Sequence, residues 1–456
     1  MNYFLGIICP IFYLLVMGGV FLRIFRRSNF WPVFLSIEYF YVLGIGIFPL
    51  FLFLGIVKIP QQYEFYRNDL ENISSISLLH IAAYAFGAFV GFFFLKRFSS
   101  AAAKSFVEKS KRININPLGF FYFLLIFSVL GASFYFSAVG FERALTSASA
   151  SRGGDFSEFD GLEGFLFLKR FTIIGLYGIA AFPFIVAKKK NLKSSFFLFF
   201  VIGVLAYLTT VSRFALFETF VTPLLIYFAY GRSKTSLKSW VIISLLFAFS
   251  FLVFLFGKEF VAAVSGFLYS GTRIEFSTAS QEAGVLDPFS HLLFSIDAGV
   301  NNFFTTGPFL ANDVLLSIFG IFPSGILSSF GLESLSYQLV SDGLRFSCIN
   351  TRNLVGREAD CIIPPYYTGV SAYLFPLVGG FFFGAMRFFL YSVMHRVWIL
   401  LRGDEAYLVV PYLALLVLQQ MMLFIPSTIS LSIFFVLMLY SYIVIGRFFH
   451  RVRWSL

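Results

Sequence analysis

Residues 257–291, GKEFVAAVSGFLYSGTRIEFSTASQEAGVLDPFSH, open the one long stretch of this chain that is too polar to lie in a lipid bilayer. The stretch continues to about Pro365 and contains ten acidic residues, five basic residues, one histidine and two of the three cysteines. Apolar blocks make up most of the chain on both sides of it. A single large charged segment between apolar blocks is where we expect this protein to carry its chemistry.

The apolar blocks place the chain outside the range of soluble proteins, because 59% of its 456 residues are hydrophobic and only 12% are charged. A helix needs about 20 apolar residues to cross the hydrocarbon core of a membrane. Eleven segments qualify, at residues 3–22, 30–57, 78–95, 118–139, 165–187, 196–211, 214–230, 240–256, 366–394, 405–423 and 429–446.

We therefore predict an all-α, polytopic integral membrane protein with about eleven transmembrane helices and one large outer-face loop that itself contains helices. The predicted parts are an N-terminal bundle of about eight helices (1–256), the large loop (257–365) and about three C-terminal helices (366–456). The first apolar block has no basic residues ahead of it and no small-residue cleavage site behind it, so we expect a retained helix rather than a signal peptide.

The basic residues predict the orientation of these helices, since cytoplasmic loops carry an excess of Lys and Arg. Clusters of Lys and Arg follow the first, third, fifth, seventh, ninth and eleventh predicted spans. This alternation predicts an N-terminus outside, a C-terminus in the cytoplasm and an outer position for residues 257–365. The net charge of +11 is then mostly a topological signal, and we expect no nucleic-acid partner.

The long loop has its own local signals. Residues 288–298 and 311–319 have helical length with apolar faces. Cys348 and Cys361 lie thirteen residues apart in a polar stretch, and an oxidising compartment would let them pair. Such a bridge would stabilise the fold by about 3 kcal/mol, and two free thiols are the alternative. Cys9 lies within a predicted span, where we expect it only to pack.

Known catalytic and metal-binding motifs do not occur in this chain. It has no paired-cysteine or His-Glu-x-x-His metal spacing, no Gly-rich phosphate loop and no Gly-x-Ser-x-Gly elbow, and its four histidines are scattered. We therefore expect neither a metal nor a cofactor. The glycine pairs Gly87/Gly91 and Gly380/Gly384 are typical of close contacts between membrane helices.

Ionisable residues in or beside the apolar blocks are candidates for function, because charges are costly there. Each also has a structural explanation: the fifth-span cations could only snorkel, Arg387 could mark a misplaced cytoplasmic boundary, and either glutamate could pair with a neighbouring arginine. These residues are Glu38, Lys169, Arg170, Arg213 at the tip of the 196–230 hairpin, Glu218 and Arg387.

Cations at the outer membrane level suggest an anionic lipid head group, and arginine in particular binds phosphate bidentately. A sugar on a lipid pyrophosphate is already activated, so an enzyme needs cations for the leaving group and a base for the attacking hydroxyl. The pyrophosphate-binding candidates are Arg213, Arg273, Arg170, Lys258, Arg345 and Arg143. The candidates for the base are Asp287, His291, Glu275 and Asp297.

Asp287 has a structural alternative as well. Asp followed by Pro is typical of a helix N-cap and first helical position, which would keep Asp287 for about 1 kcal/mol of capping. His291 follows it by four residues, one helical turn away if Pro288 starts a helix.

Several short motifs resemble the oligosaccharide repeat-unit polymerases, the Wzy-type O-antigen or capsule polymerases. The motifs are Lys169-Arg170-Phe171, Thr210-Val211-Ser212-Arg213, Asp287-Pro288-Phe289-Ser290, Phe322-Pro323 and the later glycines Gly369, Gly379, Gly380 and Gly384. Many members have a basic residue after the Phe-Pro pair, whereas this chain has Ser324, so no role is carried to that position.

The resemblance implies a GT-C-like membrane glycosyltransferase that transfers a growing glycan from polyprenyl (undecaprenyl) pyrophosphate to the next lipid-linked repeat unit. It also implies the periplasmic face of a bacterial inner membrane, and a chain-length regulator and a flippase as partners. Two alternatives stay open: a flippase or transporter of the same lipid-linked sugars, and an O-antigen ligase.

Overall fold

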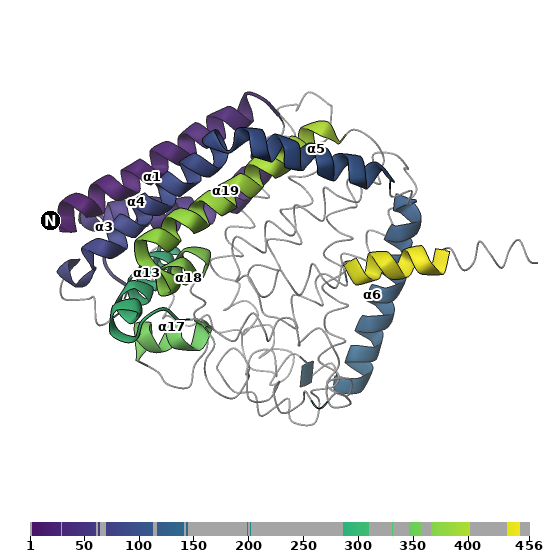
Figure 1. Cartoon of the computed structure of the whole chain (residues 1–456). Helices are drawn as coiled ribbons and strands as arrows, with labels where there is room; N and C mark the ends of the chain where they lie inside the picture. The colour runs from purple at the N-terminus through teal and green to yellow at the C-terminus, as the bar shows by residue number, and fades with distance from the viewer. Residues whose placement is uncertain are drawn as a thin grey trace, which may run out of the picture.

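The computed structural model describes residues 2–28, 30–60, 63, 70–112, 116–140, 143–144, 198, 201, 286–309, 331, 346–356, 366–401 and 436–446. All regular elements within these ranges are helices (Figure 1). They are α1 (Asn2–Phe25), α2 (Trp31–Tyr41), a π-helical segment (Val42–Ile47), α3 (Phe48–Phe53), a 3-10 turn (Leu70–Asn72), α4 (Ser75–Phe89), a second π-helical segment (Val90–Phe94), α5 (Lys96–Arg112), α6 (Pro117–Val139), α13 (Asp287–Thr306), α17 (Phe346–Val355), α18 (Tyr366–Leu374), α19 (Pro376–Leu400) and an apolar helix at Val436–Gly446.

Four of the described helices are long and apolar enough to cross a membrane. They are α1, α4 with its π-helical extension (Ser75–Phe94), most of α6 (Gly119–Val139) and α19. These helices fit the predicted α-helical membrane protein. The predicted spans at 165–187, 214–230, 240–256 and 405–423 lie outside the described residues, and of the span at 196–211 only residues 198 and 201 are described.

The second predicted span, 30–57, is not one α-helix. Its middle is the π-helical segment Val42–Ile47, which separates α2 from α3. Gly44 in this segment lies against α13, where an added Cβ would clash with Leu292 and with the carbonyl oxygen of Phe289. The glycine thus allows α13 to approach the backbone, and a π-helical turn is a common form of such a local distortion.

The ninth predicted span, 366–394, is also divided. It contains the short helix α18 and then α19, which continues to Leu400. Phe375 between them is extended, with φ −154° and ψ 103°. Pro376 explains the break, because proline disfavours the helical conformation in the residue before it and is well suited to the first position of a helix.

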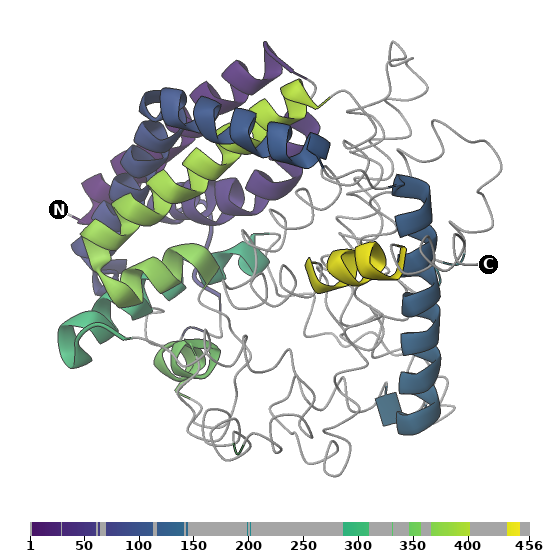
Figure 2. The same cartoon turned by 45° about the vertical axis from the view of Figure 1, so that its right-hand side comes forward.

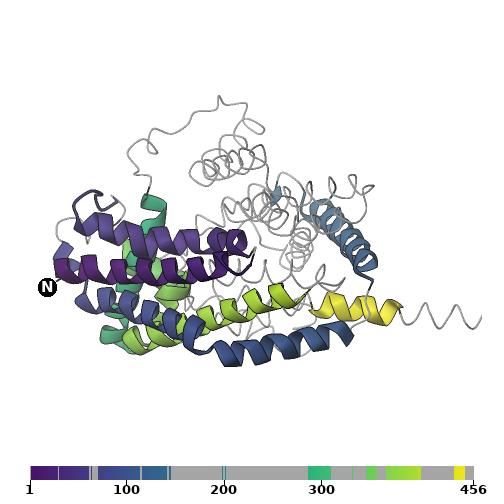
Figure 3. The same cartoon turned by 90° about the horizontal axis from the view of Figure 1, so that it is seen from above.

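Helices α4 and α19 pack through glycines, as the sequence predicts. A Cβ added at Gly87 would clash with the carbonyl oxygen of Phe381, and one added at Gly91 with that of Ala385. On the facing helix, a Cβ at Gly384 would clash with the carbonyl oxygen of Tyr84. Backbone therefore lies on backbone along this contact, and α1 packs on the other side of α4 (Figure 3).

Helix α13 belongs to the long polar segment of the sequence, yet it lies in the core of the described fold. Leu292, Leu293 and Phe294 are all fully buried, and the helix contacts α17, α18 and the first π-helical segment. The predicted helix at 288–298 is therefore part of the longer helix α13. Buried apolar residues continue along α13 beyond residue 298, to Val300. The second predicted helix, 311–319, lies outside the described residues.

One end of the bundle is formed by the starts of three helices. The Asn2 side chain donates to the carbonyl of Ile73 at 3.0 Å, so α1 and α4 begin together. The His80 ring contacts the carbonyl of Pro376, which brings the start of α19 there as well. Figures 1 and 2 show α13 and α18 at this same end. We call it the α13 end.

The opposite end gathers positive charge and is called the basic end. Arg23 lies in the last turn of α1 and Arg27 follows that helix, Lys96 follows the α4 span, and Arg396 lies in the last turns of α19. The pKa of Lys96 is lowered, chiefly by Arg23, then by Arg27, and with a smaller contribution from Arg396. Which face of the membrane this end occupies stays a prediction.

Candidate functional site

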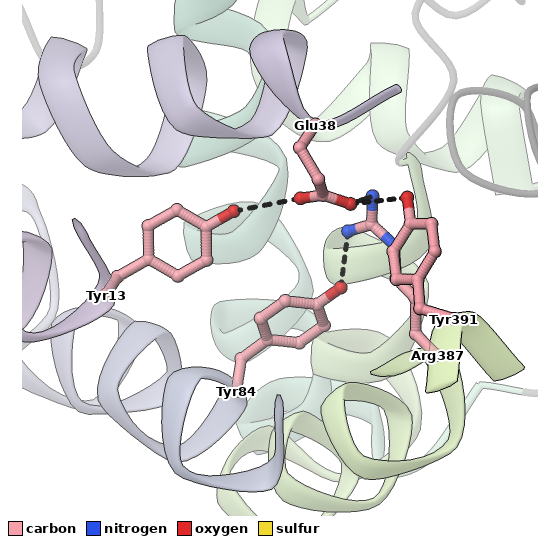
Figure 4. A network of polar contacts seen from close by, with 5 residues as sticks. All are labelled: Tyr13, Glu38, Tyr84, Arg387 and Tyr391. Carbon is pink, nitrogen blue, oxygen red and sulfur yellow. Dashed lines mark hydrogen bonds and ion pairs between the residues drawn. The ribbon is translucent and has the colours of Figure 1, made fainter. Parts of the chain in front are cut away.

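An ion pair lies between α2 and α19 in the middle of the bundle. Arg387 Nη2 donates to Glu38 Oε1 at 2.6 Å, and each side chain is only 1% exposed (Figure 4). Tyr391 donates to the same carboxylate oxygen at 2.6 Å, and Tyr13 of α1 donates to Oε2 at 3.4 Å. The carboxylate therefore receives three donors from two other helices, which is how a buried charge becomes tolerable.

Aromatic rings enclose the guanidinium. Arg387 Nη1 donates to the Tyr84 hydroxyl at 2.5 Å, and Arg387 Cζ lies 3.7 Å from the centroid of the Tyr41 ring. A cation over an aromatic face gains about 2 kcal/mol when it is desolvated. The network thus joins α1, α2, α4 and α19 around one arginine.

The ion pair decides between the explanations offered for Glu38 and Arg387. Arg387 is buried in the middle of α19, so the boundary explanation is wrong. Glu38 pairs with an arginine, and that arginine is Arg387 itself. The tyrosines were not foreseen, although Tyr391 lies four residues after Arg387 and thus on the same helix face.

A second polar cluster lies at the α13 end, around Asp297. This carboxylate is fully buried; its Oδ1 accepts from the Ser74 backbone N–H at 2.8 Å and from the Ser77 hydroxyl at 2.5 Å. Its Oδ2 accepts from the Asn301 amide at 2.9 Å. Ser74 is the N-cap of α4 and accepts from the Ile76 N–H. Asp297 therefore places a negative charge at the start of α4, where the helix dipole favours it.

Asp297 is one of the predicted candidates for the base, and its surroundings favour a structural role instead. Three hydrogen bonds from Ser74, Ser77 and Asn301 occupy both of its oxygens. A buried carboxylate with this set of donors positions helices, and α13 is thereby attached to α4.

His291 lies one turn into α13 and contacts Tyr63, which lies between α3 and α4. Its Nδ1 is hydrogen-bonded to the hydroxyl of the buried Tyr63, and the two rings meet edge to face with centroids 5.8 Å apart. His291 is itself only partly buried. Of the predicted bases, His291 is thus the one whose side chain the structure describes at a partly accessible position.

Asp287 begins α13 rather than capping it. The cap position is Leu286, which makes no side-chain capping hydrogen bond, and Pro288 is within the first turn. The sequence therefore predicts the cap one residue too late, at Asp287 instead of Leu286. Positions 287 and 291 are one turn apart in a continuous helix, as the sequence suggests.

A third group of side chains holds α13, α17 and α18 together. The Asn350 amide donates to Ser295 at 2.9 Å and accepts from the Tyr373 hydroxyl at 3.1 Å. Asn353 donates to the same tyrosine at 3.1 Å. Sequence reasoning missed these residues because no motif marks them. These polar side chains satisfy one another's hydrogen bonds between the helices of the α13 end, as buried polar groups generally do.

The predicted cations are mostly beyond the described ranges. Arg143 follows α6 and is exposed, and its neighbour Ala144 packs with Tyr135 and Val139 in a small cluster separate from the main core. Glu275, Arg170, Arg213, Lys258, Arg273 and Arg345 lie outside the described residues, so their predicted roles stay predictions.

Two of the three cysteines, Cys9 and Cys348, lie within the described residues. Cys348 in α17 is disulfide-bonded, and its predicted partner Cys361 lies outside the described residues. Cys9 is free and buried. Among the described residues, no group of three or more His, Cys, Asp or Glu side chains is arranged to hold a metal ion.

No family model, curated protein or solved structure matches this chain.

Proposed function

We propose that this chain is a membrane glycosyltransferase of the polysaccharide polymerase class. It transfers a growing glycan from polyprenyl pyrophosphate to the next lipid-linked oligosaccharide repeat unit. The reaction takes place on the outer face of a bacterial cytoplasmic membrane, and a chain-length regulator and a flippase are its expected partners.

One structural observation carries the proposal. Part of the long polar segment, from Asp287 to Thr306, is built into the core as α13, at the end of the bundle opposite Arg23, Arg27 and Lys96. A protein that acts on lipid-linked sugars needs polar side chains held in place at one membrane surface, and the contacts of Ser295, Asn350 and Tyr373 between α13, α17 and α18 support such a layer. Since basic loops favour the cytoplasm, this layer faces outward in the proposal.

The chemistry follows from the charges assigned to this layer. Arginines hold the leaving pyrophosphate, with Arg213, Arg273 and Arg170 as the first candidates and Lys258, Arg345 and Arg143 as further ones. The oxygen of the attacking sugar hydroxyl forms a bond to the glycosyl carbon, and the bond between that carbon and the pyrophosphate oxygen breaks. The base accepts the proton of the attacking hydroxyl.

His291 and Asp287 are the proposed bases, with Glu275 as a third. For His291 to accept a proton at Nε2, its Nδ1–H donates to the Tyr63 hydroxyl, and this contact then sets the tautomer. Tyr63 is thus a positioning residue in this proposal.

The ion pair between Glu38 and Arg387 favours a transporter as the second candidate, because charges near mid-membrane often line transport pathways. Its arrangement supports the transporter less than the polymerase. Both side chains are 1% exposed and hydrogen-bonded to each other and to tyrosines, so neither is accessible to a passing substrate. An O-antigen ligase shares the donor and differs only in the acceptor.

The test is the length profile of surface glycan in a strain that lacks this chain. A polymerase defect leaves one repeat unit per acceptor, whereas a ligase or flippase defect leaves no glycan on the acceptor. Complementation then tests the residues. Arg213→Lys keeps the charge but loses the guanidinium fork, so we expect a fall in chain length at normal expression.

The matched control is Arg26→Lys, an exposed arginine at the basic end, which should restore full-length glycan. Asp287→Asn removes proton acceptance with nearly the same shape. A normal glycan ladder from the Asp287→Asn protein would leave His291 or Glu275 as the base, and full chain length with Arg213→Lys would contradict the pyrophosphate assignment.

A further inference from the structure

Helix α5 is the described helix that is strongly charged although it directly follows a predicted membrane span. It begins at Lys96, two residues after the α4 span ends at Phe94, and Figure 1 shows it crossing the basic end of α19. Its sequence, KRFSSAAAKSFVEKSKR, contains one acidic residue, Glu108. Neither the ion pair nor the α13 end involves it.

One face of α5 packs on the bundle. Ser99, Ala103 and Val107 are buried at four-residue spacing, and the hydroxyls of Ser99 and Ser392 of α19 lie 2.9 Å apart. This face fixes the rotation of α5 about its own axis, because residues four apart lie along one side of a helix.

The neighbouring face is apolar and unpacked. Phe98, Ala102 and Phe106 repeat the same spacing one residue earlier, and all three are exposed. Phe98 is 69% and Phe106 is 41% exposed. Two exposed phenylalanines in line favour an apolar environment outside the protein, which at the end of a membrane bundle is the acyl region of the bilayer.

The third face is basic. Arg97 and Lys104 are seven residues apart and so lie on one side, and both are exposed. Lys109, toward the far end of the helix, is also exposed but lies on the phenylalanine side, between the positions of Phe98 and Ala102. The same end of the bundle holds Arg23 and Arg27, close enough to lower the pKa of Lys96. Like charges gathered in this way favour a negatively charged surface nearby.

We infer that α5 lies in the membrane interface at the basic end, with Phe98 and Phe106 among the acyl chains and its cations against the head groups of anionic phospholipid. An interfacial helix of a membrane protein needs one face that packs on the protein, one apolar face for the acyl chains and one basic face for the head groups, and α5 has all three. Nucleic acid or an acidic protein would satisfy the cations but would leave the phenylalanines in water.

The experiment uses the full-length chain with Ser105→Cys, an exposed position on α5, labelled with an environment-sensitive fluorophore. The protein is reconstituted into vesicles of phosphatidylcholine and phosphatidylglycerol in a 3:1 ratio, with either lipid brominated in turn. Quenching by brominated lipid reports which lipid touches the label. The chain without Ser105→Cys corrects for label at the free Cys9.

We expect both brominated lipids to quench, and phosphatidylglycerol to quench well above its share of the mixture. One lysine near an anionic surface favours it by about fivefold, so Lys104→Gln with Lys109→Gln should remove most of the preference. The control removes two exposed cations elsewhere, Lys58→Gln with Arg352→Gln, and should keep it.

High salt provides a second measurement that needs no charge variant, since it should weaken the preference by screening. An unquenched label would overturn the interfacial position. Quenching in proportion to lipid composition, unchanged by salt or by the α5 variants, would overturn the binding of anionic head groups.

Discussion

Replacing Arg387 by methionine tests how far the fold depends on the ion pair with Glu38. The substitution removes the 2.6 Å contact to Glu38 and the 2.5 Å contact to Tyr84, and leaves a carboxylate at 1% exposure. Removing one partner of a buried pair destabilises proteins by about 3–5 kcal/mol. Donation from Tyr391 at 2.6 Å persists in the variant and keeps the loss within that range.

The double variant Glu38→Gln with Arg387→Met distinguishes a true pair from two independent charges. It leaves no unpaired charge in the bundle, so its loss should be smaller than the sum of the two single losses by about 2–3 kcal/mol. Arg352→Met is the matched control, since Arg352 is exposed on α17 and its removal should change the stability little.

The assay is unfolding of the purified chain in detergent with an increasing fraction of SDS, followed by the reactivity of a thiol. Cys9 suits this readout because it is free and only 3% exposed in α1, so a maleimide dye reaches it when the bundle opens. Additive losses in the double variant, or an Arg387→Met protein as stable as the parent, would refute the reasoning about a coupled pair.

Two other predictions concern contacts between helices and use the same assay. Gly384→Ala should lower stability because its Cβ would meet the carbonyl oxygen of Tyr84, whereas Gly18→Ala, with nothing within 4 Å of an added Cβ, should be neutral or stabilise α1 by up to about 1 kcal/mol; equal effects would contradict the glycine-mediated packing of α4 on α19. Asp297→Ala should lose about 2–3 kcal/mol or more, because it leaves the buried Ser77 hydroxyl and a backbone N–H without their charged acceptor, and a protein as stable as the parent would show that α13 is held to α4 by apolar packing alone.

Hydrophobicity along the chain suffices to predict the helices whose length and composition allow them to cross the lipid bilayer. The predicted spans at 3–22, 78–95 and 118–139 correspond to α1, α4 with its extension and most of α6. The glycines of α4 and α19 are equally local signals, because a residue without a side chain is what a close helix contact requires. The division at Phe375 was also within reach of the sequence, since Pro376 marks it, but an average over the whole apolar block conceals one proline.

Other features depend on residues far apart in the chain. Glu38 and Arg387 were each notable as charges in apolar segments, but they are 349 residues apart, and only the packing of α2 near α19 makes them one pair. Asp297 and Ser77 are separated by 220 residues, so nothing near Asp297 in the sequence indicates that it is committed to the start of α4.

The position of α13 shows the same division most clearly. Its charged surroundings in the sequence predict a helix of an outer loop, and composition alone cannot tell a helix on a surface from one inserted into the end of a bundle. The π-helical segment Val42–Ile47 with Gly44 accommodates it, and neither feature signals this partner locally. Periodicity and hydrophobicity are properties of one segment, so the sequence by itself determined the long apolar helices α1, α4 and α6. Which buried charges are paired, and which polar helix joins the core, only the tertiary structure decided, because burial and pairing depend on what lies on the other side of each helix.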